Sequence, residues 1–280
     1  MNSESIITRQ NERELLTIQY AAKVHFNKAE KLLLPFYGLI LISSFLPFVT
    51  TLLNFYWPID TIISFCIELV YLFYKNDITK GSSLRNYFDD IVLETNILNL
   101  DQNEVSQIKE WAYKVYSKDP IGAEIQMRNS GKDNPPGVYN WYEFDEKKNE
   151  LDAVFECQKQ NIWFNNKSRY TAIKFNFILF FIILNCVIYF ITEYNIFDFA
   201  IKIIVLIMIL FSHLKANKDY YDISKEIDGI SKGLAKSLTE ENILLLQKEI
   251  DKKRAIPVVS INAIYNKQAK KLSELYHKIN

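Results

Sequence analysis

An ionisable side chain inside an apolar run is the most chemically informative residue of this sequence. Glu68 lies in the middle of the apolar run 57–74. A carboxylate at a bilayer midplane costs about 3 kcal/mol on insertion scales, so it is expected to face protein or water. Polar residues accompany it at helical spacings of three and four: Thr61, Ser64 and Tyr71. This stripe either lines a pore or makes polar contacts between helices, and both readings stay open.

Two further polar residues lie in apolar runs closer to the C-terminus. Lys202 follows Asp198 by four residues, a spacing at which side chains on one helix form ion pairs. Alternatively, Lys202 extends toward the membrane surface or reaches Glu68 in the assembled bundle. Asn185 is more typical of a contact between membrane helices than of a ligand-binding residue.

Sequence patterns typical of enzymes are missing. There is no P-loop, no G-x-G-x-x-G and no Gly-x-Ser-x-Gly. The three histidines lie far apart, and none has the spacing of zinc ligands; they are His25, His213 and His277. We therefore expect no enzyme, no catalytic residue, no metal and no resident cofactor.

Two pairs of apolar runs organise the chain. They cover 32–53 with 57–74, and 172–191 with 196–214. Each run is close to the ~20 residues that a helix needs to cross a bilayer, and short connections join the members of each pair. We expect an all-α membrane protein with four transmembrane helices as two hairpins and a cytoplasmic helical bundle.

The domain organisation follows from these runs. An N-terminal helix over 1–31 precedes the first hairpin at 32–74, and a helical region over 75–171 precedes the second hairpin at 172–214. The C-terminal helices occupy 215–280. None of the three polar segments is long enough for a large core of its own, so we expect them to share one bundle.

The distribution of positive charge predicts the orientation. Both hairpin tips, 54–56 and 192–195, contain no Lys or Arg, whereas the other flanks contain several. Positive residues stay on the cytoplasmic side, so both termini and the middle region are expected there. The 33 Lys and Arg residues balance the 33 Asp and Glu residues, so the net charge gives no argument for nucleic-acid binding. We expect no DNA or RNA partner.

Local signals predict helices in the polar segments. Apolar residues at spacings of three and four predict a helix over 5–31 that continues into the first span. Ser82 or Ser83 is a candidate N-cap for a new helix ending near position 97. Asp101 followed by Glu104 is a capping box for the next helix.

The remaining polar stretches are read in the same way. Residues 118–137 end in Pro-Pro-Gly and are expected to form a loop. A helix is expected from Glu150, and another over 215–238. Thr239 marks the start of a further helix that Pro257 ends, and a last helix is expected over 261–279.

Several short strings occur in order around the two hairpins. They are Arg9-Gln10-Asn11, Phe88-Asp89, Trp141-Tyr142, Cys157-Gln158, Asn161, Trp163, Arg169-Tyr170, Leu246-Gln247, Glu249-Ile250 and Arg254. With these strings the chain resembles, from end to end, the SMODS-associating four-transmembrane effector family (S-4TM) of bacterial cyclic-oligonucleotide anti-phage systems, called CBASS.

The resemblance implies a role in antiviral defence by abortive infection. A synthase that senses infection makes a cyclic oligonucleotide, and the effector then breaches the bacterial inner membrane. The implied partners are the lipid bilayer, further copies of the chain in an oligomer, and the nucleotide second messenger or its synthase or sensor. The cyclic oligonucleotide is a possible ligand, bound directly or through a partner protein.

The strings that carry the resemblance also have a structural interpretation. Their aromatic residues either anchor the fold or stack a nucleobase while Arg169, Arg254 or Lys167 meets a phosphate. Arg9-Gln10-Asn11 either caps a helix or locks the bundle. Other functions compatible with four spans are a channel or transporter subunit, and a membrane-anchored scaffold.

Overall fold

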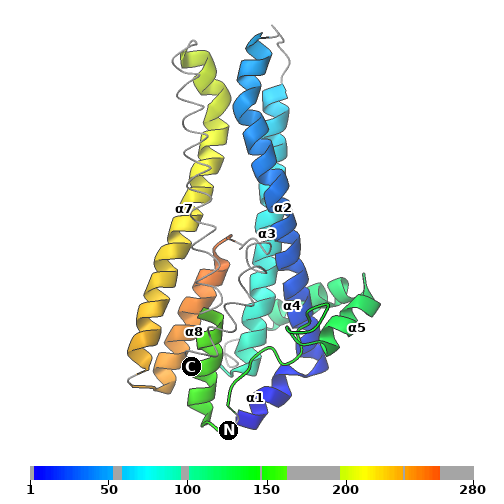
Figure 1. The fold of residues 1–280 in the computed structure, drawn as a ribbon, viewed down its shortest axis with the longest axis vertical. Helices are drawn as coiled ribbons and strands as arrows, with labels where there is room; N and C mark the ends of the chain where they lie inside the picture. The colour runs from blue at the N-terminus through cyan, green and yellow to red at the C-terminus, as the bar shows by residue number, and fades with distance from the viewer. Residues whose placement is uncertain are drawn as a thin grey trace. The chain divides into compact units, whose positions relative to one another are not determined.

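The computed structural model describes residues 3–52, 59–95, 101–145, 147–162, 196–235 and 237–258. Long helices dominate these residues (Figure 1). The helices are α1 (Ser3–Gln10), α2 (Arg13–Leu52), α3 (Ile59–Val92), α4 (Gln102–Tyr116), α5 (Pro120–Arg128), α7 (Ile196–Leu234) and α8 (Glu240–Ala255). Residues 150–162 are also helical.

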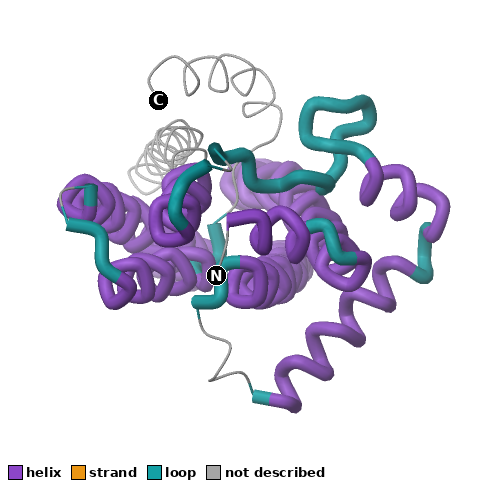
Figure 2. The backbone as a smooth tube through the Cα atoms, turned by 90° about the horizontal axis from the view of Figure 1, so that it is seen from below, coloured by secondary structure: helices purple, strands orange, loops and turns teal. Residues whose placement is uncertain are grey.

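The predicted all-helical architecture is confirmed for the described residues. Figure 2 shows helices joined by loops, and the described part of the chain contains no strand. Ser130 and Tyr139 form an isolated β-bridge, which is not part of a strand.

The chain divides into two compact units. Unit 1 comprises Met1–Asn27, Asp77–Asn166 and Asp222–Pro257. Unit 2 comprises Lys28–Asn76, Lys167–Tyr221 and Val258–Asn280. The helices α2, α3 and α7 each contribute residues to both units without interruption.

Unit 1 is built from all three polar segments of the sequence. Its main core takes Ile6 from α1, Ala21 from α2, Phe88 from α3 and Ile243 from α8. A second cluster packs α7 against α8 through Ile227 and Leu246 among others. Because no segment fills this core alone, the three segments fold together.

In unit 2, aromatic side chains join α2 to α3. Phe36 stacks on Tyr71 with ring centroids 5.6 Å apart. Tyr71 in turn stacks on Tyr74 at 6.1 Å. These rings, with Ile40 and Ile67, are buried between the helices of the first predicted hairpin.

The predicted membrane spans have different outcomes. Residues 32–52 lie in α2, 59–74 in α3 and 196–214 in α7. The third span, 172–191, lies outside the described residues. Among the described residues, no helix combines the length and the apolar character needed to cross a membrane.

Two helix starts are confirmed by their caps. The side chain of Asp101 accepts a hydrogen bond from the Asn103 amide and begins α4. The side chain of Thr239 accepts one from the Asn242 amide and begins α8. A helix also begins at Glu150, as predicted, whereas the last predicted helix, 261–279, lies outside the described residues.

The predicted helix start at Ser82 or Ser83 is wrong. α3 runs through both residues and ends at Val92, before Glu94 adopts a left-handed φ of 54°. The Ser82 hydroxyl donates to the Arg254 carbonyl oxygen at 2.6 Å. This serine therefore makes a tertiary contact from within a helix, which the capping pattern cannot distinguish from an N-cap.

Two other boundaries differ from expectation. The predicted loop 118–137 contains α5, whose N-cap Asp119 accepts a hydrogen bond from the Gly122 amide and whose first residue is Pro120. Both are helix-start signals. The predicted helix over 5–31 is interrupted at Asn11 and Glu12, where the chain turns from α1 into α2.

Candidate functional site

A buried carboxylate at the end of α3 gathers three segments that are far apart in the sequence. Asp89 is fully buried, and its Oδ1 accepts a hydrogen bond from the Tyr142 hydroxyl at 2.5 Å. Its Oδ2 accepts from Asn161 Nδ2 at 3.1 Å and from Arg254 Nη2 at 2.6 Å. One turn earlier on α3, Arg85 places Nε 3.7 Å from Oδ1. We call these five residues the Asp89 network.

The other polar groups of the Asp89 network also have partners. Asn161 Nδ2 donates to the Tyr142 hydroxyl at 2.7 Å, and its Oδ1 accepts from Arg85 at 3.3 Å. Arg254 Nη1 donates to Asn86 Oδ1 at 3.1 Å. Because buried polar groups are costly when unpaired, these reciprocal contacts favour one arrangement of the four segments.

The α1 helix is attached to the end of α3 through Arg9. Its guanidinium donates from Nε and Nη2 to the Val92 carbonyl oxygen at 3.1 and 2.9 Å. Nη1 forms an ion pair with Glu94. Arg9 thereby donates hydrogen bonds to a backbone carbonyl oxygen that has no partner within α3, because the helix ends there.

The next two residues attach α1 to the segment that contains Tyr142. The Gln10 side chain accepts from the Tyr142 amide at 2.8 Å and donates to its carbonyl oxygen at 3.3 Å. Asn11 repeats the pattern with Asn140, accepting from its amide at 3.0 Å and donating to its side chain at 2.7 Å. Arg9-Gln10-Asn11 therefore joins α1 to the end of α3 and to residues 140–142.

A second series of hydrogen-bonded polar side chains runs along α8 to Arg254, the residue that pairs with Asp89. Gln158 Nε2 donates to the Ile243 carbonyl oxygen at 3.0 Å and to Gln247 Oε1 at 3.2 Å. Gln247 Nε2 donates to Asp251 Oδ1 at 2.9 Å. Asp251 Oδ1 lies 3.6 Å from Arg254 Nη1, so Asp251 connects this series to Arg254.

Trp141 covers the Asp89 network from the surface. The guanidinium carbon of Arg85 lies 4.0 Å from the centre of the Trp141 ring, a cation–π contact. Trp141 keeps 37 % of its surface exposed, whereas the neighbouring Tyr142 is buried.

Burial and neighbouring charge shift the protonation of these groups. Burial lowers the pKa of Arg254, but the carboxylates of Asp89 and Asp251 more than offset this and raise it. Burial also lowers the pKa of Arg85, although a guanidinium keeps its proton in proteins. Burial and the charge of Asp89 raise the pKa of Tyr142, so its hydroxyl stays a hydrogen-bond donor.

Two carboxyl groups beside the Asp89 network titrate near neutral pH. Burial raises the pKa of Asp251 to about 7, with Arg254 acting in the opposite direction. Burial raises the pKa of Asp90 to about 6, although the hydrogen bond from Thr95 opposes the shift. The surroundings of Arg254 therefore change in charge between weakly acidic and weakly basic conditions.

Among the described side chains, no group of three or more His, Cys, Asp or Glu is arranged to hold a metal ion. Burial raises the pKa of the Cys157 thiol well above its ordinary value, so it is no reactive thiolate. What the arrangement does is tie together four helices and a loop segment.

Comparison with known families decides the identity of the chain. The model of the SMODS-associating 4TM effector domain matches residues 4–239. The chain belongs to this family. No curated protein and no solved structure gives a significant match to this S-4TM chain.

Several residues of the S-4TM strings make the contacts described above. These are Arg9, Gln10, Asn11, Trp141, Tyr142, Gln158, Asn161, Gln247 and Arg254. Tyr142, Asn161 and Arg254 belong to the Asp89 network, and Gln10 and Trp141 contact it. Arg9 and Asn11 attach α1 to the end of α3 and to Asn140. Gln158 and Gln247 connect to Arg254 through Asp251. Trp163 and Arg169 lie outside the described residues.

This arrangement favours a structural role for Arg254 over phosphate binding. Its guanidinium is buried and makes hydrogen bonds to Asp89 and Asn86. A phosphate would have to replace both partners.

The intramembrane stripe predicted on α3 does not share one environment. Glu68 is exposed, Ser64 is half-buried and Tyr71 is buried in its aromatic stack. Thr61 lies on α3 and Lys202 on α7, but their side chains are outside the described part of the structure. Asn185 lies outside the described residues, so the pairings proposed for Lys202 and Asn185 stay predictions.

Sequence reasoning missed the centre of the site. Asp89 occurs in one of the strings, but nothing marked it as the common acceptor. Arg85 and Asp89 are separated by four residues, the spacing of a helical ion pair, which was the available signal. Asn86 and Asn140 carried no local signal because their partners are 168 and 129 positions away.

Proposed function

We propose that this S-4TM chain is a membrane effector of bacterial anti-phage defence that permeabilises the inner membrane in response to a cyclic-oligonucleotide signal. The observation that carries the proposal is the family match over residues 4–239. The signal is received by unit 1, as the bound nucleotide or as a partner that carries it. The response involves no catalysis, and several copies act together.

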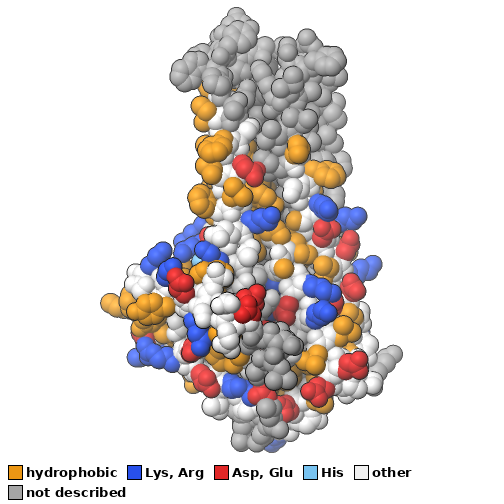
Figure 3. All heavy atoms as spheres, turned by 180° about the vertical axis from the view of Figure 1, so that it is seen from behind, with side chains coloured by type: hydrophobic (Ala, Val, Ile, Leu, Met, Phe, Trp, Pro, Cys, Tyr) orange, Lys and Arg blue, Asp and Glu red, His pale blue; other side chains and the backbone are white. Residues whose placement is uncertain are grey.

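Exposed apolar side chains support contact between unit 2 and lipid. Figure 3 shows large hydrophobic side chains on the surface of the described part of this unit. The exposed large hydrophobic residues of unit 2 include Leu34, Ile42, Ile62, Phe65, Leu69, Leu72, Phe73, Met208 and Phe211. An exposed apolar surface of this extent is costly in water and favourable in a bilayer.

The Asp89 network supports a coupling role. It fastens α8, Tyr142 and Asn161 to α3. Arg9 and Gln10 attach α1 to the end of α3 and to Tyr142. α3 continues without interruption into residues 59–76, which belong to unit 2. In our proposal the signal shifts the population from this locked arrangement to one in which the network is broken.

The function is tested in cells that express the chain with and without its synthase. Membrane potential and entry of a membrane-impermeant dye are followed after infection. The proposal predicts depolarisation and dye entry only when both proteins and the infection are present. An intact membrane under those conditions refutes it, and constant ion flux without toxicity points to a channel subunit.

The coupling role is tested by removing the hydroxyl group of Tyr142. Tyr142→Phe removes the donor to Asp89 and keeps the ring, so dye entry is expected at a lower signal level. Tyr139→Phe is the matched control, because Tyr139 is exposed and lies three residues away. Equal signal thresholds for both variants and the parent chain rule out the Asp89 network as the coupling element.

The intramembrane stripe is tested at Glu68. Glu68→Gln and Glu68→Leu are expected to reduce permeabilisation if the carboxylate hydrates a pore. Unchanged permeabilisation in both variants removes the stripe from the mechanism. It then favours unit 2 as an anchor for a scaffold.

A further inference from the structure

Two helices of unit 1 expose apolar faces with no packing partner among the described residues. On α5, Ile121 is 77 % exposed and Ile125 lies one turn further on the same face. On α8, Leu244 and Leu245 are exposed side by side. Figures 1 and 2 place α5 and α8 on different sides of unit 1, so these faces do not cover each other within one chain.

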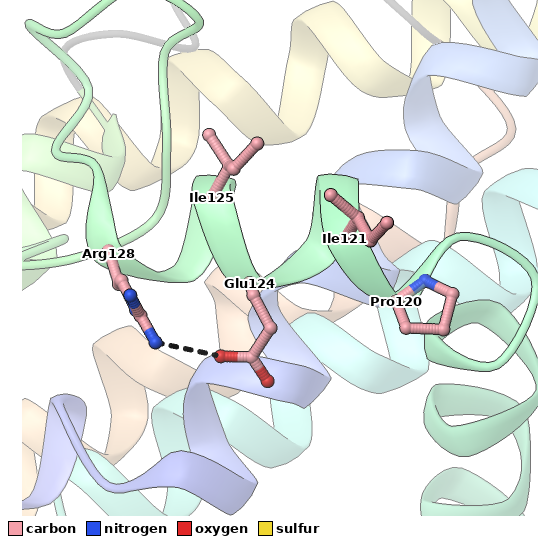
Figure 4. A pocket seen from close by; sticks show the side chains of 5 residues that line it. All are labelled: Pro120, Ile121, Glu124, Ile125 and Arg128. Carbon is pink, nitrogen blue, oxygen red and sulfur yellow. Dashed lines mark ion pairs between the residues drawn. The ribbon is translucent and has the colours of Figure 1, made fainter.

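The α5 face is slightly hollowed. Pro120, Ile121, Glu124, Ile125 and Arg128 line a hollow of about 300 Å³. Figure 4 shows Ile121 and Ile125 side by side, with the ion pair between Arg128 and Glu124 next to them. A hollow of this volume has room for one or two leucine side chains.

The charges that flank the two faces are complementary in one orientation. On α5, Asp119 precedes the isoleucines and Arg128, 82 % exposed, follows them. On α8, the order along the chain is the same, with exposed Glu240 and Glu241 before the leucines and exposed Lys248 after them. An antiparallel pair of helices therefore sets each charge opposite one of the other sign.

The spacing along the helix axes agrees with this orientation. At a rise of about 1.5 Å per residue, Arg128 lies about 7 Å from the middle of its apolar pair and Glu240 about 7 Å from the middle of the leucines. Asp119 and Lys248 lie about 6 and about 5 Å away in the other directions. Both charged ends therefore align when the apolar residues meet, and the helix dipoles oppose each other favourably.

From this complementarity we infer that α5 of one copy docks on α8 of the next copy, antiparallel, with Leu244 and Leu245 in the α5 hollow. The contact is heterologous, because it joins two different surfaces. Repetition of a heterologous contact produces a closed ring or an open filament. The inference rests on the proposed function, since it names the contact through which the effector oligomerises.

Disulfide trapping in membranes tests the contact on the full chain. Two differently tagged chains are co-expressed, one with Ile125→Cys and the other with Leu245→Cys, and a mild oxidant is added. A disulfide-linked dimer containing both tags is expected at about ten times the yield of the control. The control replaces Ile125→Cys by Tyr113→Cys, which is also exposed but lies on α4.

Charge reversal supplies a second readout. Arg128→Glu places like charges opposite Glu240 and Glu241 and is expected to lower the mixed-dimer yield about ten-fold. Glu240→Lys with Glu241→Lys on the partner chain is expected to restore it. Lys114→Glu on α4 is the control, because Lys114 is exposed and outside the α5 face.

The outcomes separate this inference from the proposed function. Ile125→Cys linking mainly to itself, a mixed yield equal to that of the control, or no rescue by the reversed charges overturns the contact. If such cells still admit dye after the signal, the effector function stands and only the interface is wrong. If the mixed dimer forms but no dye enters, the interface stands and the function is refuted.

Discussion

Asp89 is the residue on which the arrangement of unit 1 depends most. It is fully buried and depends on Arg254, Tyr142 and Asn161 to compensate the loss of water around its charge. The buried ion pair of Asp89 and Arg254 is not by itself evidence of high stability, but removal of one partner leaves the other as an uncompensated buried charge. Variants at this site should therefore be more damaging than variants of exposed ion pairs.

Arg254→Met is expected to lower the free energy of unfolding by about 3 kcal/mol, because Asp89 loses its closest cation. Arg85 remains 3.7 Å from Asp89 and holds the loss near the lower end of the usual range. The measurement is denaturant unfolding of the full chain in detergent.

The control for this prediction is Lys252→Met, two residues away. Lys252 is exposed and pairs with Glu249, so its loss should stay within about 0.5 kcal/mol. The double variant Arg254→Met with Asp89→Leu should recover part of the stability, because no buried charge is then left. If Arg254→Met is no more destabilising than Lys252→Met, the pair does not hold the segments together.

The raised pKa values of Asp251 and Asp90 predict that unit 1 loses stability as the pH rises from 5 to 8. The folded values are about 7 and about 6, whereas an unfolded aspartate titrates near 4. The folded state therefore binds these protons more tightly, and the stabilisation is complete below about pH 4. It is lost as the pH passes through the folded pKa values.

The melting temperature of the full chain across this pH range checks the prediction. Asp251→Asn should flatten the decline, leaving a smaller part from Asp90. Asp133→Asn is the control, because hydrogen bonds from Ser130 lower the pKa of Asp133 and its titration is complete below pH 5. Equal slopes for Asp251→Asn and the parent chain contradict the assignment.

At the scale of elements, the loop after α5 positions Tyr142 and depends on one glycine. Gly137 donates its amide to the Ser130 carbonyl oxygen at 2.7 Å, and Val138 donates to the Gln126 carbonyl oxygen at 2.8 Å. Lys23 of α2 also contacts this loop through the Pro136 carbonyl oxygen. The loop thus reaches the Asp89 network with little freedom.

Gly137→Ala should destabilise this loop strongly, because the new Cβ would lie 1.9 Å from the Asn129 carbonyl oxygen. The backbone must shift, so we expect a loss of more than about 2 kcal/mol and faster amide exchange in residues 137–142. Gly131→Ala in the same loop is the control, since its Cβ would meet open space. Hydrogen exchange that is identical in the two variants would show that the loop is not held this way.

The two units differ most clearly at the scale of the whole molecule. Unit 1 surrounds its core with charged side chains, whereas the described part of unit 2 exposes many large apolar ones (Figure 3). The difference predicts that an aspartate introduced at an exposed aromatic position affects membrane association in unit 2 and not in unit 1.

Phe65→Asp in unit 2 should reduce membrane association, whereas Tyr113→Asp in unit 1 should not. Phe65 is 63 % exposed and Tyr113 69 % exposed, so neither change creates a cavity in a core. An aspartate in a lipid-facing position costs about 3 kcal/mol. The measurement is the fraction of the chain that stays with membranes after an alkaline carbonate wash, and equal fractions contradict lipid contact by this face.

The sequence by itself determined the features that depend on local patterns. Asp101 and Thr239 were identified as helix starts because a capping side chain and its amide partner lie within three residues. The apolar periodicity of each segment determined the all-helical class. α5 is not predicted although Asp119 and Pro120 are helix-start signals, because the Pro-Pro-Gly at the other end of the segment favours a loop.

The tertiary structure alone decided which strings meet, and where. Arg9, Tyr142 and Arg254 belong to segments more than a hundred residues apart, and no periodicity relates them. They meet because one buried carboxylate, Asp89, and the end of α3 require donors that α3 itself does not provide. The cost of unpaired buried polar groups selects that meeting point, and it acts only once the segments are packed.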